Sequence, residues 1–224
     1  MSIRRAAAAA VVILLGAAPA HAQTPYRQTV VVTAATAPVE LGSITRTMTI
    51  ITREQIDALP AHTVADVLRL APSVDVRARG IMGVQSDFAI RGANFGQMLM
   101  LVDGVRLNDA QSGHHNSDIP VPLEAVERIE ILQGPGSAIF GADAFGGTVN
   151  VITPRTAPAS FQVRGGGDGY AAGSGQWGIE RGGNSQLLSV TADRSSGFMY
   201  DRDFKNAIVR SRTSFGRSTV SLSF

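Results

Sequence analysis

Glycines crowd the segment 134–147, and glycine-rich turns are a common cradle for bound phosphate. The spacing does not fit either phosphate-binding pattern. A dinucleotide fingerprint that starts at Gly134 needs a further glycine where Ile139 stands. A phosphate loop needs Lys followed by Ser or Thr where Ala142 and Asp143 stand. We therefore expect these glycines to serve unusual backbone angles and close packing.

No other set of residues in the sequence suggests catalysis or metal binding. After residue 22 the histidines are His62, His114 and His115, which lack the spacing of metal ligands. No serine lies in a G-x-S-x-G elbow, and the chain has no cysteine. We expect a protein that is not an enzyme, with no metal and no cofactor.

Two polar loops, 79–87 and 108–120, offer the best chemistry for binding a ligand. The second, NDAQSGHHNSDIP, is too long for a hairpin turn and has little apolar content to hold it in a core. A solvated loop without ligand contacts remains an equally good reading for any one residue. The candidate ligand-binding residues are Gln85, Ser86, Asn108, Gln111, Ser112, His114, His115 and Asn116.

Four charged residues, Arg91, Asp103, Arg128 and Glu130, lie beside apolar strand segments. Buried charges need partners to offset their desolvation, so we expect ion pairs here. Such pairs could be rearranged during function, or they could be ordinary structural pairs that never move. Both readings stay open.

The segments around these residues predict short strands joined by tight turns. Asp103-Gly104 stands between MLMLV and VRL, which is the strongest short signal for a hairpin. Downstream, Arg128 and Glu130 alternate with two isoleucines before the glycine run. Such short strands need partners outside themselves to bury both faces. Segments 46–52 and 73–78 are further predicted strands.

Two short core helices are predicted between these strands. The sequence Thr52-Arg53-Glu54-Gln55 is a capping box, and that helix ends before Pro60. A second helix starts at Thr63, with its buried face at Val64, Val67, Leu68 and Ala71.

After residue 155 the pattern changes to about five strands with polar and apolar positions in alternation. Ser189, Thr191 and Asp193 oppose Leu188, Val190 and Ala192. Gly182-Gly183-Asn184 predicts a short turn and 195–206 a longer loop. A wall between lipid and a polar interior requires this alternation.

The N-terminus carries two further signals. Residues 1–22 have a basic start, an apolar run and an Ala-His-Ala end, which predict a secretory signal peptide. Without residues 1–22 the chain has 18 basic and 18 acidic side chains, so its charge does not favour nucleic acid. The segment 28–34, QTVVVTA, favours an extended strand.

Taken together, IRG, LVDGVRLN and VERIEILQGPGSAIFGADAFGGTVNVIT resemble the plug domain of a TonB-dependent outer-membrane receptor, closest to the cobalamin and siderophore group. The resemblance implies an α+β plug, a small mixed sheet with short helices, followed by the first antiparallel strands of a transmembrane β-barrel. It divides the chain into a signal peptide (1–22), a periplasmic extended segment (23–44), a plug (45–155) and the start of the barrel (156–224).

The resemblance also implies partners and a cellular place. The TonB box, which the partner TonB captures by β-augmentation, would be Thr29, Val30, Val31, Val32 and Thr33. Binding of a scarce ligand such as a cobalamin or a ferric siderophore to the polar loops would free the box on the periplasmic side of the outer membrane. The four charged residues would hold plug to wall or lie within the plug. The alternative for the segment 28–34 is a first strand of the plug sheet.

The remaining chain is short for such a barrel. About 22 strands of 9 to 11 residues need roughly 200 residues, whereas 64 follow residue 160. We therefore expect a fragment of a receptor. The alternative from another class is a free-standing periplasmic binding or scaffold module without transport activity.

Overall fold

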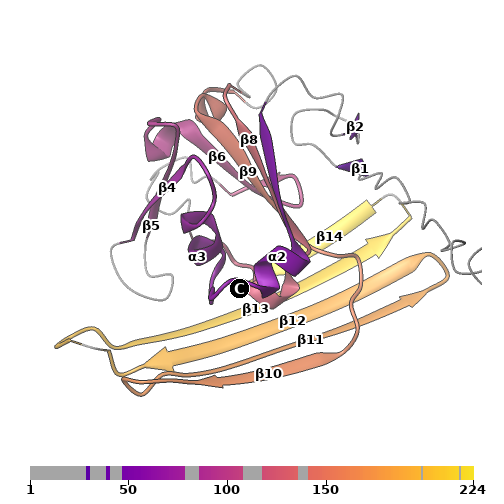
Figure 1. Cartoon of the computed structure of the whole chain (residues 1–224). Coiled ribbons are helices and arrows are strands. Elements are labelled where there is room, and N and C mark those ends of the chain that lie inside the picture. The colour runs from indigo at the N-terminus through magenta and orange to yellow at the C-terminus, as the bar shows by residue number, and fades with distance from the viewer. Residues whose placement is uncertain are drawn as a thin grey trace, which may run out of the picture.

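The protein is described here by a computed structural model. The structure describes residues 29–30, 39–40, 47–78, 86–107, 118–135, 141–197, 199–216 and 218–224, with the backbone alone at 29–30 and 39–40. Two bodies lie against each other, a small mixed domain and a broad five-stranded sheet (Figure 1). None of the described helices is long and apolar enough to cross a membrane.

The small domain is built on a five-stranded sheet in the order β3-β8-β9-β6-β7. Its strands are β3 (Met48–Thr52), β8 (Arg128–Gln133), β9 (Gly147–Ile152), β6 (Met98–Val102) and β7 (Val105–Arg106). Only β6 and β9 run parallel; the other neighbours are antiparallel. Asp103 and Gly104 both have positive φ in the turn between β6 and β7, so the predicted tight hairpin is confirmed.

The two predicted helices are confirmed, and both carry their capping boxes. Helix α2 (Arg53–Asp57) starts at Thr52, and helix α3 (Val64–Arg69) starts at Thr63. In Figure 1 both helices lie on the side of the small sheet that faces the broad sheet. A separate hairpin of β4 (Val74–Ala78) and β5 (Ser86–Ile90) follows them.

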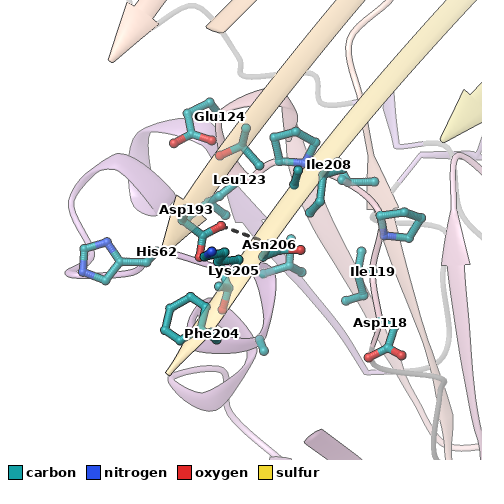
Figure 2. A pocket seen from close by; sticks show the side chains of 18 of the residues that line it. His62, Asp118, Ile119, Leu123, Glu124, Asp193, Phe204, Lys205, Asn206 and Ile208 are labelled. Carbon is teal, nitrogen blue, oxygen red and sulfur yellow. Dashed lines mark hydrogen bonds between the residues drawn. The ribbon is translucent and has the colours of Figure 1, made fainter. Parts of the chain in front are cut away.

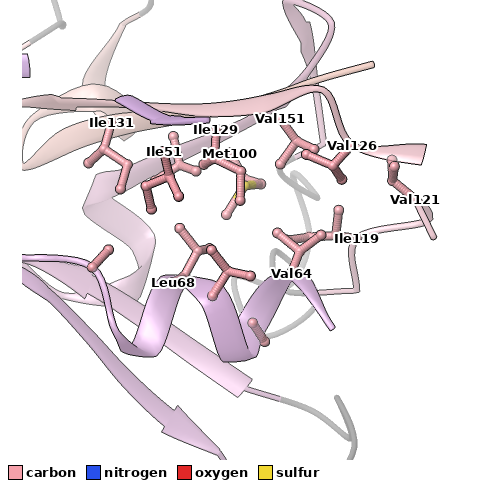
Figure 3. Packing of buried hydrophobic residues seen from close by; sticks show 14 of the residues in the cluster. Ile51, Val64, Leu68, Met100, Ile119, Val121, Val126, Ile129, Ile131 and Val151 are labelled. Atoms are coloured by element: carbon pink, nitrogen blue, oxygen red, sulfur yellow. The ribbon is translucent and has the colours of Figure 1, made fainter. Parts of the chain in front are cut away.

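The core lies between α3 and the small sheet. Figure 3 shows Val64 and Leu68 of α3 opposite Met100, Ile129 and Val151 of the sheet. These side chains are buried, so strand alternation and helix periodicity identified the same core. The short 3-10 helix η4 (Leu123–Ala125) adds Leu123 and Ala125 to the same cluster.

Two adjacent glycines allow close packing at the start of β9. A Cβ on Gly146 would lie 2.3 Å from the Cβ of Ala93, and one on Gly147 would lie 2.6 Å from the carbonyl oxygen of Leu132. No side chain fits there without a shift of the backbone. This is the close backbone approach expected from the glycine-rich segment.

The broad sheet is an antiparallel meander, which confirms the predicted five strands. They are β10 (Ser160–Gly165), β11 (Ala171–Arg181), β12 (Asn184–Ser195), β13 (Phe204–Phe215) and β14 (Ser218–Ser223). The predicted Gly182-Gly183 turn joins β11 to β12. The loop between β12 and β13 spans 196–203, shorter than predicted, because the strands extend further at both ends.

The alternation predicted for the broad sheet matches its two faces. On β12 Ser189 and Thr191 are buried toward the small domain, whereas Leu188 and Val190 are exposed on the outer face. The exposed apolar set continues on the neighbouring strands with Phe161, Val163, Trp177, Ile179, Val209, Val220 and Leu222.

Several predictions from the N-terminal half fall outside the described residues. They include the signal peptide, Val31, Val32 and Thr33 of the box, and the loop residues Gln85, Asn108, Gln111, Ser112, His114, His115 and Asn116. One boundary is wrong: Ser86 was assigned to the loop 79–87, but it lies in β5 and is 3% exposed. The reason is that β5 pairs with β4 as far as Ser86 and Ala78, which extends the hairpin into the predicted loop.

Candidate functional site

The small domain and the broad sheet are joined by a largely buried carboxylate, that of Asp103, whose side chain is 12% exposed. It sits in the turn after β6, where its own backbone has φ 51°. Arg210 Nη2 donates to Oδ2 at 2.7 Å, and Arg212 Nη1 donates to Oδ1 at 3.3 Å. Both arginines project from β13 and are largely buried, with side chains 6% and 13% exposed. We call the contact between the small domain and the broad sheet the seam, and we name Asp103, Thr153, Arg210 and Arg212 the seam clamp.

Thr153 completes the seam clamp from the end of β9. Its backbone N–H and its hydroxyl donate to the two oxygens of Asp103, at 2.8 and 2.7 Å. Arg212 in turn donates to the backbone carbonyl and the hydroxyl oxygen of Thr153. Four donors therefore converge on one carboxylate, and two guanidinium groups share its single negative charge as their counter-charge.

A second pair lies inside the small domain. Arg128 Nε donates to Glu130 Oε1 at 2.9 Å, and Arg128 also pairs with the exposed Glu127. Glu130 is 0% exposed, and its Oε2 has no hydrogen-bond partner within the described part of the chain. Burial raises the pKa of Glu130 to about 7, although the guanidinium of Arg128 opposes the shift.

Arg91, the fourth predicted charge, lies apart from these pairs. It follows β5 in an exposed turn with φ 52°. Among the described residues it has no ion-pair partner. The structure therefore brings together Arg128 with Glu130, and Asp103 with the broad sheet, but not Arg91 with any of them.

A pocket of about 410 Å³ opens along the same seam. Figure 2 shows residues of the small domain, among them His62, Asp118 and Leu123, around the same space as Asp193 and Asn206 of the broad sheet. Asn206 Nδ2 donates to Asp193 Oδ1 at 3.1 Å. A further cross-seam ion pair lines the pocket, in which Arg164 of β10 donates to Glu124 of η4 at 2.7 Å.

The inner face of the broad sheet leaves several polar atoms without protein partners. The hydroxyls of Ser174, Ser185 and Ser189 are buried, and within the described residues none of them makes a hydrogen bond. Unsatisfied buried hydroxyls are uncommon in a tightly packed core. The seam is thus polar and connected at a few points rather than packed like the core of the small domain.

The linker between the two bodies, residues 153–159, crosses β11 at Gly178. A Cβ on Gly178 would lie 2.5 Å from Thr156 Oγ1 and 2.6 Å from the backbone N and O of Ala157. The linker therefore passes directly over the backbone of β11. Glycine is required there by close approach rather than by an unusual φ.

Sequence reasoning missed most of the partners on the broad sheet. The sequence predicts alternating strands in this region, but it does not by itself single out Arg210, Arg212, Thr153, Glu124 or Arg164. One signal was available. Two arginines at alternate positions, on a face that also carries several serines and threonines, need a carboxylate from the body packed against that face.

The described residues contain no group of three or more His, Cys, Asp or Glu side chains that could hold a metal ion. At the N-terminus, β1 (Thr29–Val30) pairs with β2 (Val39–Glu40) in an antiparallel ladder separate from the small sheet. Among the described strands, β1 is therefore not a strand of that sheet, which was the alternative reading of the segment 28–34.

Comparison with known families identifies the small domain. Residues 40–148 match the TonB-dependent Receptor Plug Domain. The matched region contains the small sheet except the last four residues of β9, together with α2, α3 and the β4–β5 hairpin.

Similar proteins include a curated relative and several solved structures. The vitamin B12 transporter BtuB of Vibrio vulnificus (strain CMCP6) is 38% identical over 144 residues, which are 64% of this chain and 23% of BtuB. The pyoverdine–iron complex of FpvA from Pseudomonas aeruginosa matches with a TM-score of 0.71 at 16% identity, covering 85% of this chain and 26% of FpvA. The alcaligin outer-membrane receptor FauA from Bordetella pertussis matches with a TM-score of 0.68 at 18% identity, covering 88% and 34%.

The two structural matches establish the fold, because both extend over the plug and into the broad sheet. The chain spans about a quarter of the length of BtuB and between a quarter and a third of each receptor structure. Members of the matched family are transporters and not enzymes. Residues 40–148 of this chain are therefore a TonB-dependent receptor plug domain, and its homologues include BtuB.

Proposed function

We propose that this chain forms the plug and the adjoining wall of an outer-membrane receptor for active uptake of a scarce ligand. The plug gates the passage through the receptor. Energy reaches the plug from TonB, which captures the box at residues 29–33 on the periplasmic side. The ligand class is a cobalamin or a ferric siderophore, since the relatives include a vitamin B12 transporter and a receptor in complex with pyoverdine and iron.

The two faces of the broad sheet carry this proposal. Its outer face exposes large apolar side chains, including Trp177 and Ile179, whereas its inner face places Ser189 and Arg210 against the plug. A soluble protein would bury the apolar face and expose the polar one. The observed arrangement suits a wall with lipid on one side and a polar plug on the other.

The seam suits a plug that must release from its wall. Contact depends on polar groups, and the seam clamp is one compact ion-pair cluster rather than an apolar core. In the proposed mechanism, tension on the box loosens the plug against the wall while the plug's own apolar core stays packed. The ligand would be sensed first by the predicted loops 79–87 and 108–118, as the resemblance implies, although residues 86 and 87 lie in β5.

Energy coupling is tested by proline in the predicted box. Val31→Pro removes a backbone donor that an augmenting partner strand would use. The full-length gene product, expressed in cells that lack their own receptor, should bind labelled cyanocobalamin or a labelled ferric siderophore normally but fail to accumulate it. Thr36→Pro, in the same segment but outside the box, is the matched control and should support uptake.

Normal uptake by Val31→Pro would refute the box assignment. Lack of binding to either ligand class by the parent protein would refute the proposed ligands but not the coupling. A free-standing periplasmic module would be recovered as a soluble monomer, and that result would reject the proposed wall.

A further inference from the structure

We propose that the pocket along the seam binds a small zwitterion, namely an amino acid with an apolar side chain. The pocket has a volume of about 410 Å³ and lies between the small domain and the broad sheet. A space of this size holds a small molecule, whereas a cobalamin or a ferric siderophore is larger than the pocket. The amino acid is therefore a second ligand, distinct from the one transported, and its binding does not depend on transport.

Two opposite charges in the lining of the pocket have no ionic partner. Asp193 of β12 and Lys205 of β13 both line the pocket, and Asp193 lies directly opposite Asn206, the residue after Lys205. Asp193 accepts a hydrogen bond from Asn206 at 3.1 Å, but in the described part of the chain neither Asp193 nor Lys205 forms an ion pair. We name these two residues the open charges. A ligand that carries both an ammonium and a carboxylate group can bind both of them.

The other carboxylates and the guanidinium around the pocket already have partners. Arg164 donates to Glu124 at 2.7 Å, a contact that joins the wall to the plug. Asp118 is engaged as well. An outside ion that entered the pocket would therefore meet the open charges without having to break an existing ion pair.

Apolar side chains from both bodies form much of the remaining lining. Ile119 and Leu123 come from the small domain, and Phe204 and Ile208 come from β13. In Figure 2, Phe204 lies next to the open charges, and Leu123 and Ile208 lie farther along the pocket. The apolar part of a ligand can cover these surfaces while its charged end meets the open charges. This arrangement indicates an amino acid with an apolar side chain.

An amino acid in this pocket would contact both bodies at once. Its charged end would lie on β12 and β13 of the wall, and its side chain would reach Ile119 and Leu123 of the plug. A ligand that binds two surfaces only while they are together stabilises their contact. Occupancy of the pocket would therefore hold the plug against the wall, in addition to the seam clamp.

The test uses three probes that share a phenyl group and a two-carbon chain. L-Phenylalanine carries both charges, 2-phenylethylammonium lacks the carboxylate, and 3-phenylpropionate lacks the ammonium. Ligand-observed NMR follows their titration with the full-length gene product in mild detergent. The parent should bind L-phenylalanine with a Kd on the order of 1 mM or lower. It should bind either single-charge probe about fivefold to tenfold more weakly. Absence of saturable binding, or binding without this preference, would overturn the proposal.

Two variants assign each charge of the probe to its partner. Asp193→Asn should bind L-phenylalanine no more tightly than 3-phenylpropionate, because the ammonium has lost its partner. Lys205→Gln should bind it no more tightly than 2-phenylethylammonium, because the carboxylate has lost its partner. The matched controls are Asp203→Asn and Arg202→Gln, which change exposed charges in the loop before β13 that do not line the pocket. Both controls should bind like the parent.

Ile119→Ala tests the plug side of the pocket and should weaken all three probes by about threefold. Unchanged binding in this variant would place the probe on the wall alone and contradict the bridging role. Equal losses in the controls and in the open-charge variants would mean diffuse attraction and would overturn the proposal. Displacement of L-phenylalanine by cyanocobalamin or a ferric siderophore would assign the pocket to the transported ligand instead. Because binding is measured without uptake, its failure would leave the proposed transport intact.

Discussion

Polar and apolar residues alternate along the strands of both the plug and the broad sheet, but the apolar face is buried in the plug and exposed in the broad sheet. In the plug sheet Ile129, Ile131 and Val151 point into a core covered by α3. In the broad sheet the corresponding apolar series, from Trp177 to Val209, is exposed, and the polar series faces the plug. An alternating sequence therefore predicts that the two faces of a strand differ, but the surroundings of the strand determine which face is buried.

The difference extends to how each body is stabilised. The plug has an apolar core that excludes water, so its stability should depend on packing. The seam between plug and wall depends on a few buried charges, so its stability should depend on their pairing. The next four experiments test this contrast, from the largest expected effect to the smallest.

Asp103→Asn should have the largest effect. Asparagine tolerates the positive φ of this turn, but it leaves Arg210 and Arg212 buried without a counter-charge, which typically destabilises a protein by about 3–5 kcal/mol. Urea unfolding of the full-length gene product in detergent measures this loss. The control Asp75→Asn removes an exposed pair with Arg77 and should change stability by less than about 1 kcal/mol. Equal effects would mean that the seam clamp contributes no more than a surface pair.

Two isoleucines compare the two bodies directly. Ile131 is 0% exposed in the plug, whereas Ile179 is 49% exposed on the outer face of the wall. Ile131→Ala should lower the free energy of unfolding by about 2–5 kcal/mol. Ile179→Ala should lower it by less than about 0.5 kcal/mol in detergent. The same loss in both variants would contradict the assignment of the outer face.

Glu130 should make the plug less stable as the pH rises. Its pKa is raised from about 4.5 to about 7 by burial, so between these values the folded protein holds a proton that the unfolded chain has lost. The contribution of Glu130 to stability should be greatest below about pH 4.5 and should fall by about 3 kcal/mol up to pH 7. Unfolding free energies across this range, compared with Glu130→Gln, measure the slope, which the variant should lack. Glu127→Gln, an exposed neighbour, should keep the slope.

Gly178→Ala should have the smallest of these effects, and it reports on the linker between the bodies. The added methyl group would collide with Thr156 and Ala157, and overpacking of this kind destabilises by about 1–3 kcal/mol. Gly173→Ala on the same strand meets nothing within 4 Å and should be nearly neutral. Thermal unfolding compares the two variants, and equal melting temperatures would show that the linker does not hold its place over β11.

Local signals predicted most elements of the fold. The capping boxes at Thr52 and Thr63, the Asp103-Gly104 turn and the Gly182-Gly183 turn each act within a few residues, and all four are present. Long-range order was less accessible. Nothing in the sequence shows that β6 and β9 pair in parallel, since about forty-five residues separate them.

The candidate site was predictable only in part, for the same reason. Arg128 and Glu130 are two residues apart on one strand, so their pairing follows from alternation. The two arginine partners of Asp103 lie more than a hundred residues downstream, and only their inward position on a largely polar face indicated them. The loops proposed to sense ligand and the rest of the box stay predictions from the resemblance.

The most direct test of the membrane placement uses Trp177, the single tryptophan of residues 1–224, which is half-exposed on the outer face of β11. A full-length gene product in which every other tryptophan is replaced by Phe is placed in bilayers of lipids brominated along their acyl chains. Its fluorescence is compared with that in unbrominated lipid and in the presence of aqueous acrylamide. A lipid-facing wall predicts strong quenching by the brominated chains and little by acrylamide. Quenching by acrylamide alone would place this face in water and contradict the account.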